Sequence, residues 1–249
     1  SGNNASRIFN TSDTVTISGL TLRDGYTANS GGAIQTTAPL TLTAVAVISN
    51  TAATWGGAIY NNGGSLTLTN ADISGNVASS AGGAIYNNGG SLTLTNTGFS
   101  GNISSGANGG AIYNDGGTAA LTNILFSGNK AASGGAIYNN SSLQLINATF
   151  SGNLAPYNPG GAIANAGSGT VQLVNGVVWG NSTSGPPGAQ IYNTGSTVTL
   201  SYTLIQSGTG SIDILGSVIF GPGVITTDPL FVAPIAATSA PTTTGNYRL

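Results

Sequence analysis

Residues 56–76 read GGAIYNNGGSLTLTNADISGN, and closely similar sequence recurs along the chain about every 26 residues. The intervals between equivalent isoleucines are 25, 26, 27, 25, 26 and 28 residues, for Ile34, Ile59, Ile85, Ile112, Ile137, Ile163 and Ile191. A period of roughly 20–50 residues is typical of solenoids, propellers and linear arrays. The 249 residues are therefore predicted to form one elongated repeat domain.

Each repeat has the pattern of three short strands. Residues 57–61 are β-prone, residues 62–64 are a turn signal, and residues 65–70 alternate leucine with polar side chains before a third run at 71–74. Helical periodicity is missing, and a four-stranded propeller blade needs roughly 40–45 residues. The predicted fold class is all-β: a right-handed parallel β-helix with three short strands in each coil of ~26 residues, and about eight or nine coils.

Equivalent residues of successive coils should stack in columns, because each strand pairs in register with its neighbours roughly 4.8 Å away. Three apolar columns are expected to fill the interior. The first holds the seven isoleucines of the period. The other two are Leu42, Leu68, Leu94, Leu121, Leu145, Leu173 and Leu200, and Val47, Ile73, Phe99, Phe126, Phe150 and Val178.

Asparagine columns mark the corners between strands, because asparagine tolerates left-handed turns and stacked amides bond one another. The three columns are Asn61, Asn87, Asn114, Asn139, Asn165 and Asn193; Asn70, Asn96, Asn123, Asn147 and Asn175; and Asn50, Asn76, Asn102, Asn129, Asn153 and Asn181. The paired glycines before each alanine-isoleucine should form tight bends in which a Cβ would clash.

The repeat pattern also sets the expected boundaries. Residues 15–231 are predicted to form the β-helix, a rod on the order of 40 Å long. Residues 1–14 are a possible cap or subunit contact, and residues 232–249 are a tail or cap rich in proline and threonine. Because the chain begins Ser1-Gly2-Asn3, we expect a removed leader or a larger parent polypeptide.

Charge is scarce: the chain has four Lys or Arg and six Asp, and charged residues are 4% of the total. Soluble proteins usually reach about 25%. Nucleic-acid binding is not expected, because phosphate recognition needs clustered basic side chains. No apolar run approaches the roughly 18–20 residues of a membrane span.

The residues of common catalytic sites are scarce as well. Histidine and cysteine are absent, which excludes the usual nucleophile–base pairs and common metal ligands. The acids are Asp13, Asp24, Asp72, Asp115, Asp213 and Asp228, and no two share an interior column. Parallel β-helices also include polysaccharide lyases, which need paired acids or calcium with a base. We expect no enzyme, cofactor or metal site here; a lyase-like activity is the weaker alternative.

Two outward-facing columns are candidate binding surfaces. A tyrosine ladder follows the core isoleucines, at Tyr60, Tyr86, Tyr113, Tyr138 and Tyr192. Strand alternation should point it outward, where it either binds sugars or simply stabilises the stacked strands. Rows of Thr-x-Thr, as at Thr67 and Thr69, resemble the ice-binding faces of antifreeze proteins, but they decay to Gln144 and Ile146.

The ends of a solenoid expose unpaired strand edges unless they are capped. No amphipathic capping helix is apparent in the sequence. The candidate assembly residues are Val15, Ile17, Leu20 and Leu22 at one end, and Ile212, Ile214, Ile219 and Phe231 at the other. Contact between unlike ends does not close, so it generates filaments, and the expected partner is another copy of this chain.

The repeated phrases Gly-Gly-Ala-Ile and Phe-x-x-Asn, the latter at residues 99–102, 126–129 and 150–153, resemble the repeats of chlamydial polymorphic outer membrane proteins. They look still more like the β-helical surface proteins of free-living bacteria such as Chloroflexi and cyanobacteria. The resemblance covers roughly residues 15–249. It implies a secreted or cell-surface protein with a structural or adhesive role, and no shared catalytic residues.

The sequence therefore predicts a non-enzymatic extracellular rod that associates end to end into filaments or serves as a surface stalk. The main alternative is an adhesin that binds glycans, or a host or neighbouring cell surface, through the tyrosine ladder. A lyase-like enzyme and an ice-binding protein are the weaker alternatives.

Overall fold

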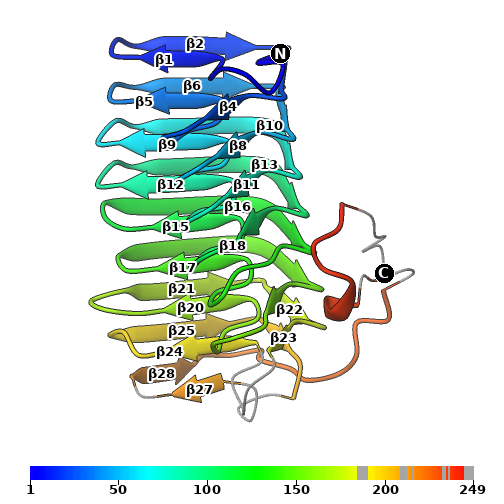
Figure 1. Cartoon of the computed structure of the whole chain (residues 1–249). Helices are drawn as coiled ribbons and strands as arrows, with labels where there is room; N and C mark the ends of the chain where they lie inside the picture. The colour runs from blue at the N-terminus through cyan, green and yellow to red at the C-terminus, as the bar shows by residue number, and fades with distance from the viewer. Residues whose placement is uncertain (184–189, 208–211, 215, 232–233, 235, 244–249) are drawn as a thin grey trace.

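Parallel strands of successive coils stack in register along one axis (Figure 1). The computed structural model describes residues 1–183, 190–207, 212–214, 216–231, 234 and 236–243. All strand pairs in these ranges are parallel, and each joins one coil to the next. The predicted fold class, an all-β parallel β-helix with coils of about 26 residues, is confirmed.

The first sheet carries the isoleucine column. Within the described ranges it has nine strands, in the order β1 (Phe9–Thr11), β5 (Ile34–Thr36), β9 (Ile59–Asn62), β12 (Ile85–Asn88), β15 (Ile112–Asn114), β17 (Ile137–Asn139), β20 (Ile163–Asn165), β24 (Ile191–Asn193) and β27 (Ile212–Ile214). Each isoleucine pairs with the isoleucine of the next coil, as Ile59 does with Ile85. The repeat phrase therefore sets the register.

The second sheet carries the leucine columns. Its order is β2 (Val15–Ser18), β6 (Leu40–Thr43), β10 (Leu66–Ser74), β13 (Leu92–Ser100), β16 (Thr118–Ser127), β18 (Ser142–Ser151), β21 (Thr170–Val174), β25 (Thr197–Ser201) and β28 (Ser217–Phe220). In the four long strands, β10 to β18, the predicted second and third strands are continuous. They bend at a left-handed asparagine, such as Asn96 with φ 50°. In other coils the third strand is separate: β3 (Thr21–Arg23), β7 (Ala46–Ile48), β22 (Val177–Trp179) and β26 (Leu204–Ile205).

A further set of two-residue strands is not predicted by the sequence. These are β4 (Tyr26–Thr27), β8 (Thr51–Ala52), β11 (Val77–Ala78) and β14 (Ile103–Ser104), followed by the pair β19 (Leu154–Ala155) and β23 (Ser182–Thr183). All but β4 begin directly after a buried corner asparagine. Two residues are too few to show alternation, so these strands are identifiable only once the coils are stacked.

The three predicted core columns are confirmed, because every one of their side chains is at most 1% exposed. The phenylalanines of the third column stack face to face, with ring centroids 5.1 Å apart for Phe99 and Phe126 and 4.8 Å apart for Phe126 and Phe150. Each fully buried side chain of this size contributes roughly 1.5–3 kcal/mol to folding.

Two of the asparagine columns lie inside the protein and tie the coils together. Asn102 donates from Nδ2 to Asn129 Oδ1 at 2.9 Å and to the Ile73 carbonyl at 2.9 Å. Its own Oδ1 accepts the backbone N–H and the side-chain amide of Asn76, both at 3.0 Å. The Asn61 column forms a second buried ladder, as in the 2.7 Å bond from Asn61 to Asn87. The left-handed Asn70 column is exposed, but its amides bond one another too.

The described C-terminal residues lie along the flank of the rod. Residues 236–243, which include the 3-10 helix η2 (Ala237–Ser239), pass beside the middle coils in Figure 1. The Thr242 N–H donates to the Gly128 carbonyl at 3.1 Å, and Ala237 and Ala240 are buried. This part of the predicted tail or cap therefore covers a side of the solenoid.

We predict that the buried ladder is far less tolerant of mutation than the exposed one. Asn102→Ala should lower the free energy of unfolding by about 3 kcal/mol, because it strands the buried Asn76 N–H and the Ile73 carbonyl. Asn96→Gly keeps a left-handed corner and removes only exposed amides, so it should change stability by less than about 0.5 kcal/mol. Urea denaturation measures the free energy of unfolding of both variants. Equal destabilisation would show that the buried amides do not stabilise the fold more than the exposed ones.

The second glycine of the repeat phrase gives another prediction. A Cβ on Gly83 would collide with the Gly110 carbonyl and lie 2.5 Å from the Ile103 carbonyl carbon, whereas a Cβ on Gly98 has nothing within 4 Å. Gly83→Ala should destabilise the fold by about 2 kcal/mol. Gly98→Ala should be neutral or stabilising by up to about 1 kcal/mol. A thermal melt that ranks the two variants in reverse would contradict the close approach of the coils.

Candidate functional site

The tyrosine ladder stands on the outer side of the first sheet. Each tyrosine directly follows a core isoleucine, and strand pairing places Tyr60, Tyr86, Tyr113 and Tyr138 in one register. The rings of Tyr86 and Tyr113 stack with centroids 4.8 Å apart and planes 3° apart. Those of Tyr113 and Tyr138 are 5.0 Å apart. The sequence prediction of a stacked aromatic ladder therefore holds for Tyr86, Tyr113 and Tyr138, whereas the Tyr60 ring is tilted by 48° to that of Tyr86.

Pointing outward does not leave the whole ladder exposed. Tyr60 and Tyr86 are only 8% exposed, because Ala81 and the large Trp55 ring pack against them. Sequence reasoning missed Trp55, which stands directly before the paired glycines where other coils carry a small or polar residue. This departure from the repeat was the signal from which the covering of the tyrosines could have been predicted. The exposed part of the predicted stripe is therefore limited to its C-terminal half.

The tyrosine hydroxyls belong to a polar row at the end of the same strands. Tyr86 donates to Asp115 Oδ2 at 2.7 Å. Asn140 Nδ2 donates to Tyr113 Oη at 3.0 Å and to Asp115 Oδ1 at 2.9 Å. Burial, together with the nearby Asp115 charge, raises the pKa of Tyr113 to about 12. Burial and the bond to Asp115 also raise the pKa of Tyr86, so these hydroxyls are neutral at physiological pH.

The other acids whose side chains the structure describes do not gather into a site. Asp72 pairs in register with Ala46 and Gly98, and burial raises the pKa of its carboxyl. Asp24 lies 3.6 Å from Arg23 in a surface ion pair. Over the ranges that the structure describes, no three His, Cys, Asp or Glu side chains come together.

The threonine face of the second sheet is not flat. A hollow of about 410 Å³ opens over its C-terminal half, lined by residues that include Ala119, Ala120, Gln144, Gln172 and Thr199. The small side chain of Ala120 interrupts the row that runs through Thr16, Thr41, Thr67 and Thr93. This shape differs from the uniform plane that ice binding would require.

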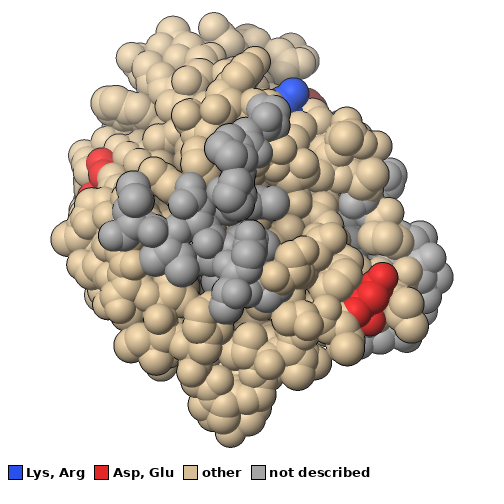
Figure 2. Space-filling model, turned by 90° about the horizontal axis from the view of Figure 1, so that it is seen from below, with Lys and Arg blue, Asp and Glu red and all other residues tan. Residues whose placement is uncertain are grey.

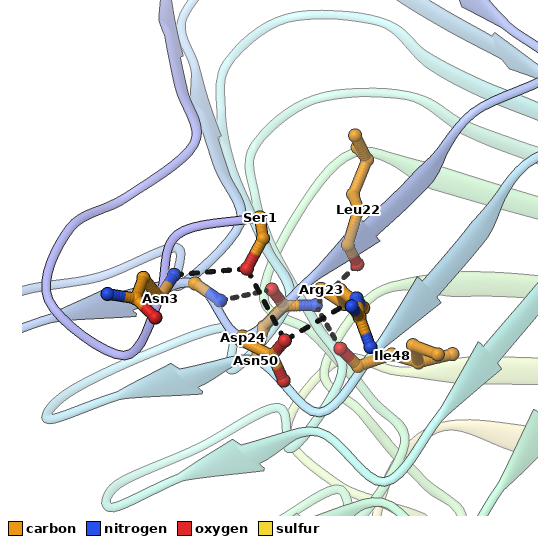
Figure 3. A network of polar contacts seen from close by, with 8 residues as sticks. Ser1, Asn3, Leu22, Arg23, Asp24, Ile48 and Asn50 are labelled. Carbon is orange, nitrogen blue, oxygen red and sulfur yellow. Dashed lines mark hydrogen bonds and ion pairs between the residues drawn. The ribbon is translucent and has the colours of Figure 1, made fainter.

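At the N-terminal end, the first residues are hydrogen-bonded to the first coil. Gly2 and Asn4 donate backbone bonds to the carbonyls of Arg23 and Asp24, and Ser1 Oγ donates to Asp24 Oδ2 at 3.3 Å (Figure 3). Nearby, the Asn50 amide donates to the Leu22 and Ile48 carbonyls, both at 3.1 Å. This network anchors the outer corner of the first coil.

Of the assembly residues predicted at this end, only one is well exposed. Ile17 and Leu22 are buried, at 7% and 3% exposure, and Val15 is half-buried. Leu20, at the corner, is 47% exposed. Strands β1 and β2 are the first of their sheets, so no described strand pairs with their outer edges.

The C-terminal end is more apolar. Strand β28 ends its sheet, and its Ile219 and Phe220 are 52% and 39% exposed. Ile225 and Leu230 are 51% and 76% exposed beyond it. Figure 2 looks onto this end and shows very few charged side chains among the described residues. Four large apolar side chains, those of Ile219, Phe220, Ile225 and Leu230, are therefore exposed on or just beyond the last strand.

Three further residues were predicted to contribute to assembly at this end. Phe231 is half-buried. Ile212 and Ile214 lie on β27, and their backbones pair with Ile191 and Asn193 of β24. The side chains of Ile212 and Ile214 lie outside what the structure describes.

The covered ladder leads to a prediction about pH. In the folded protein the neutral form of Tyr113 is favoured, because its pKa rises from about 10 to about 12. That stabilisation is present below pH 10 and is lost as the pH rises through 12. Urea midpoints should fall over this range, and Asp115→Asn should lower the pKa values of Tyr86 and Tyr113 in a tyrosinate absorbance titration. Ionisation of all nine tyrosines near pH 10 without unfolding would contradict the burial of the ladder.

Comparison with known families identifies the repeat. The model of the Chlamydia polymorphic membrane protein repeat matches residues 45–62, 70–88 and 123–140. Each match includes a buried corner asparagine and the paired glycines, and runs to the next buried asparagine. No curated protein and no solved structure gives a significant match.

The matched repeats are typical of surface-associated or outer-membrane-associated proteins. Among the residues that the structure describes, none of the helices has the length and apolarity to cross a membrane. The predicted resemblance is confirmed by three matches in separate coils and by the solenoid itself. The chain is therefore a β-solenoid repeat protein, and three of its segments match the repeat of the chlamydial polymorphic membrane proteins.

Proposed function

We propose that this chain is a structural rather than catalytic protein, an extracellular rod that joins other copies of itself end to end. The observation that carries the proposal is the outer edge of β28, with exposed Ile219 and Phe220 beside it. The dispersed acids and neutral tyrosine hydroxyls also favour a role without catalysis.

The geometry of β28 suits the addition of another strand. The N–H groups of Ser217 and Gly221 bond to the preceding coil, at the Ser196 and Leu200 carbonyls. Because alternate residues of a strand bond to opposite neighbours, the N–H groups of Val218 and Phe220 face away from the stack. Each backbone bond to an added strand is worth about 1 kcal/mol net.

The first coil of a second copy offers a matching strand. Val15 and Ile17 of β2 begin the same two core columns that Val218 and Phe220 of β28 end. Stacking β2 of one copy below β28 of another would continue both columns. This contact joins unlike ends, so it does not close and generates a filament.

Low charge favours this contact. Exposed strand edges in monomeric proteins are usually protected by charged side chains, especially lysine. Here β28 has no charged residue, and neither has β2. Residues 1–4 bond beside β3, which leaves β1 and β2 as the accessible edges of the first coil.

The structure also selects the residue with which to test the proposal. Phe220 lies in an axial column, whereas Ile219 points outward and Ile17 is buried. Phe220→Asp should prevent filament growth, because it places a charge on the docking face. Thr93→Asp adds the same charge to an exposed site in the middle of the rod and is the matched control.

Electron microscopy and sedimentation velocity over a concentration series would measure the outcome. We expect unbranched filaments from the unmodified chain and from Thr93→Asp, and single rods from Phe220→Asp, with unchanged circular dichroism. Single rods from the unmodified chain at every concentration, or filaments from Phe220→Asp, would overturn the proposal.

A further inference from the structure

Five aromatic side chains form a continuous series on the outer side of the first sheet, and we call this series the aromatic chain. Its members are Trp55, Tyr60, Tyr86, Tyr113 and Tyr138. The centroid of the Trp55 ring lies 5.5 Å from that of Tyr86 and 6.0 Å from that of Tyr60. The steps from one tyrosine to the next are 5.7, 4.8 and 5.0 Å. Each ring therefore contacts the next, and an electron can pass along the series in short steps.

The aromatic chain has one well-exposed member close to two buried ones. Trp55 is 42% exposed, whereas Tyr60 and Tyr86 beneath it are 8% exposed. A reagent in solution therefore reaches the indole before it reaches these two phenols. The other tryptophan, Trp179 of β22, makes no ring contact with the aromatic side chains that the structure describes. It serves as an internal comparison for Trp55.

The composition directs oxidation toward these rings. The protein has no cysteine and no methionine, but it has two tryptophans and nine tyrosines. Sulfur-containing side chains are common first sites of oxidation in proteins. Without them, the indole and phenol rings are the side chains most easily oxidised by the loss of one electron. An exposed indole that contacts further rings, such as Trp55, is the natural entry point.

Tyr86 has the partner that oxidation of a phenol requires. A phenol that loses an electron becomes strongly acidic and passes its proton to a base. Tyr86 Oη donates to Asp115 Oδ2 at 2.7 Å, within the roughly 2.6–3.2 Å over which side chains exchange protons. Asp115 is exposed, so it can release the proton to water. The Tyr60 hydroxyl instead donates to the amide oxygen of Asn62 at 3.5 Å, and an amide is not a base at neutral pH.

We propose that the aromatic chain is a path for one-electron oxidation, along which a radical passes from Trp55 at the surface to the Tyr86–Asp115 pair. A one-electron oxidant, such as a peroxyl or azide radical, takes an electron from the Trp55 indole, and the indole N–H proton leaves to water. Tyr86 then gives an electron to the indolyl radical and its hydroxyl proton to Asp115 Oδ2. The indole regains a proton from water, and the unpaired electron stays on the Tyr86 ring. This path lies on the side of the rod, so the proposal is independent of end-to-end association.

Pulse radiolysis of an azide solution tests the path, because the azide radical oxidises indoles in preference to phenols at neutral pH. Trp179→Phe leaves Trp55 as the one tryptophan, and Trp55→Phe leaves Trp179. In Trp179→Phe, the visible absorption of the indolyl radical should decay at the rate at which the tyrosyl radical band grows, whatever the protein concentration. In Trp55→Phe, this transfer should be at least about tenfold slower, because the remaining indole contacts no described tyrosine ring.

Further substitutions in the Trp179→Phe protein identify the acceptor. Tyr86→Phe keeps the ring but removes the hydroxyl, and it should slow the transfer at least about tenfold. Asp115→Asn still offers an oxygen to the Tyr86 hydroxyl but no base, so a similar loss of about tenfold is expected. Asp72→Asn removes an exposed acid from the other sheet and is the matched control, with an unchanged rate. Circular dichroism should show that every variant is folded.

Three results would overturn the proposal. The first is equal rates of transfer from Trp55 and Trp179. The second is decay of the Trp55 radical without growth of the tyrosyl band. The third is an unchanged rate in folded Tyr86→Phe or Asp115→Asn, which would show that the radical does not pass to this pair.

Discussion

The structure depends on the hydrogen bonds of the buried asparagines, which tie successive coils together. Within each column an inner asparagine bonds both to the backbone and to the amide of its counterpart in the next coil, as Asn76 does with Asn102, whereas Asn181 at the end of its column bonds to Gln190. A buried amide without such partners would cost a few kcal/mol, so the coils along the middle of the rod return an asparagine to the same corner. The number of residues from one asparagine to the next in this column differs between coils. It is 24 from Asn129 to Asn153 and 28 from Asn153 to Asn181. The extra residues lie between the corners, and the pairing of the asparagines is unchanged.

In-register stacking also accounts for the unusual composition. Any side chain repeated in the sequence is repeated about 4.8 Å away in space. Phenylalanine, tyrosine and asparagine gain from this arrangement, because rings stack and amides bond one another. A charged side chain repeated in every coil would lie next to a side chain of the same charge, and this repulsion destabilises adjacent strands. The one acid of the polar row, Asp115, is flanked by Asn88 and Asn140. In-register repetition therefore disfavours any column that repeats the same charge.

In a regular solenoid, surface features that differ from coil to coil occur where the sequence repeat is interrupted or ends. The last coil leaves an edge without a described partner beside Phe220, and a hollow of about 270 Å³ lies beside Tyr138 and Tyr192, the two tyrosines between which Ala164 interrupts the ladder. The first feature suits another strand. The two features lie on different surfaces, one axial and one lateral, so a rod that associates lengthwise leaves its side free.

The repeat period and the alternation of leucine with threonine determined the fold class, the three core columns and the asparagine corners, because in-register pairing turns sequence spacing directly into position. Tertiary structure alone decided exposure. Tyr60 and Tyr138 follow the same motif, yet Trp55 packs against the first and a hollow adjoins the second. Ile219 and Phe220 are neighbours, yet only Phe220 continues a core column. The two-residue strands and the return of residues 236–243 to the flank also depend on contacts between distant segments. A repeating sequence specifies which residues stack, whereas the loops that cover a column follow no period and are placed only by packing.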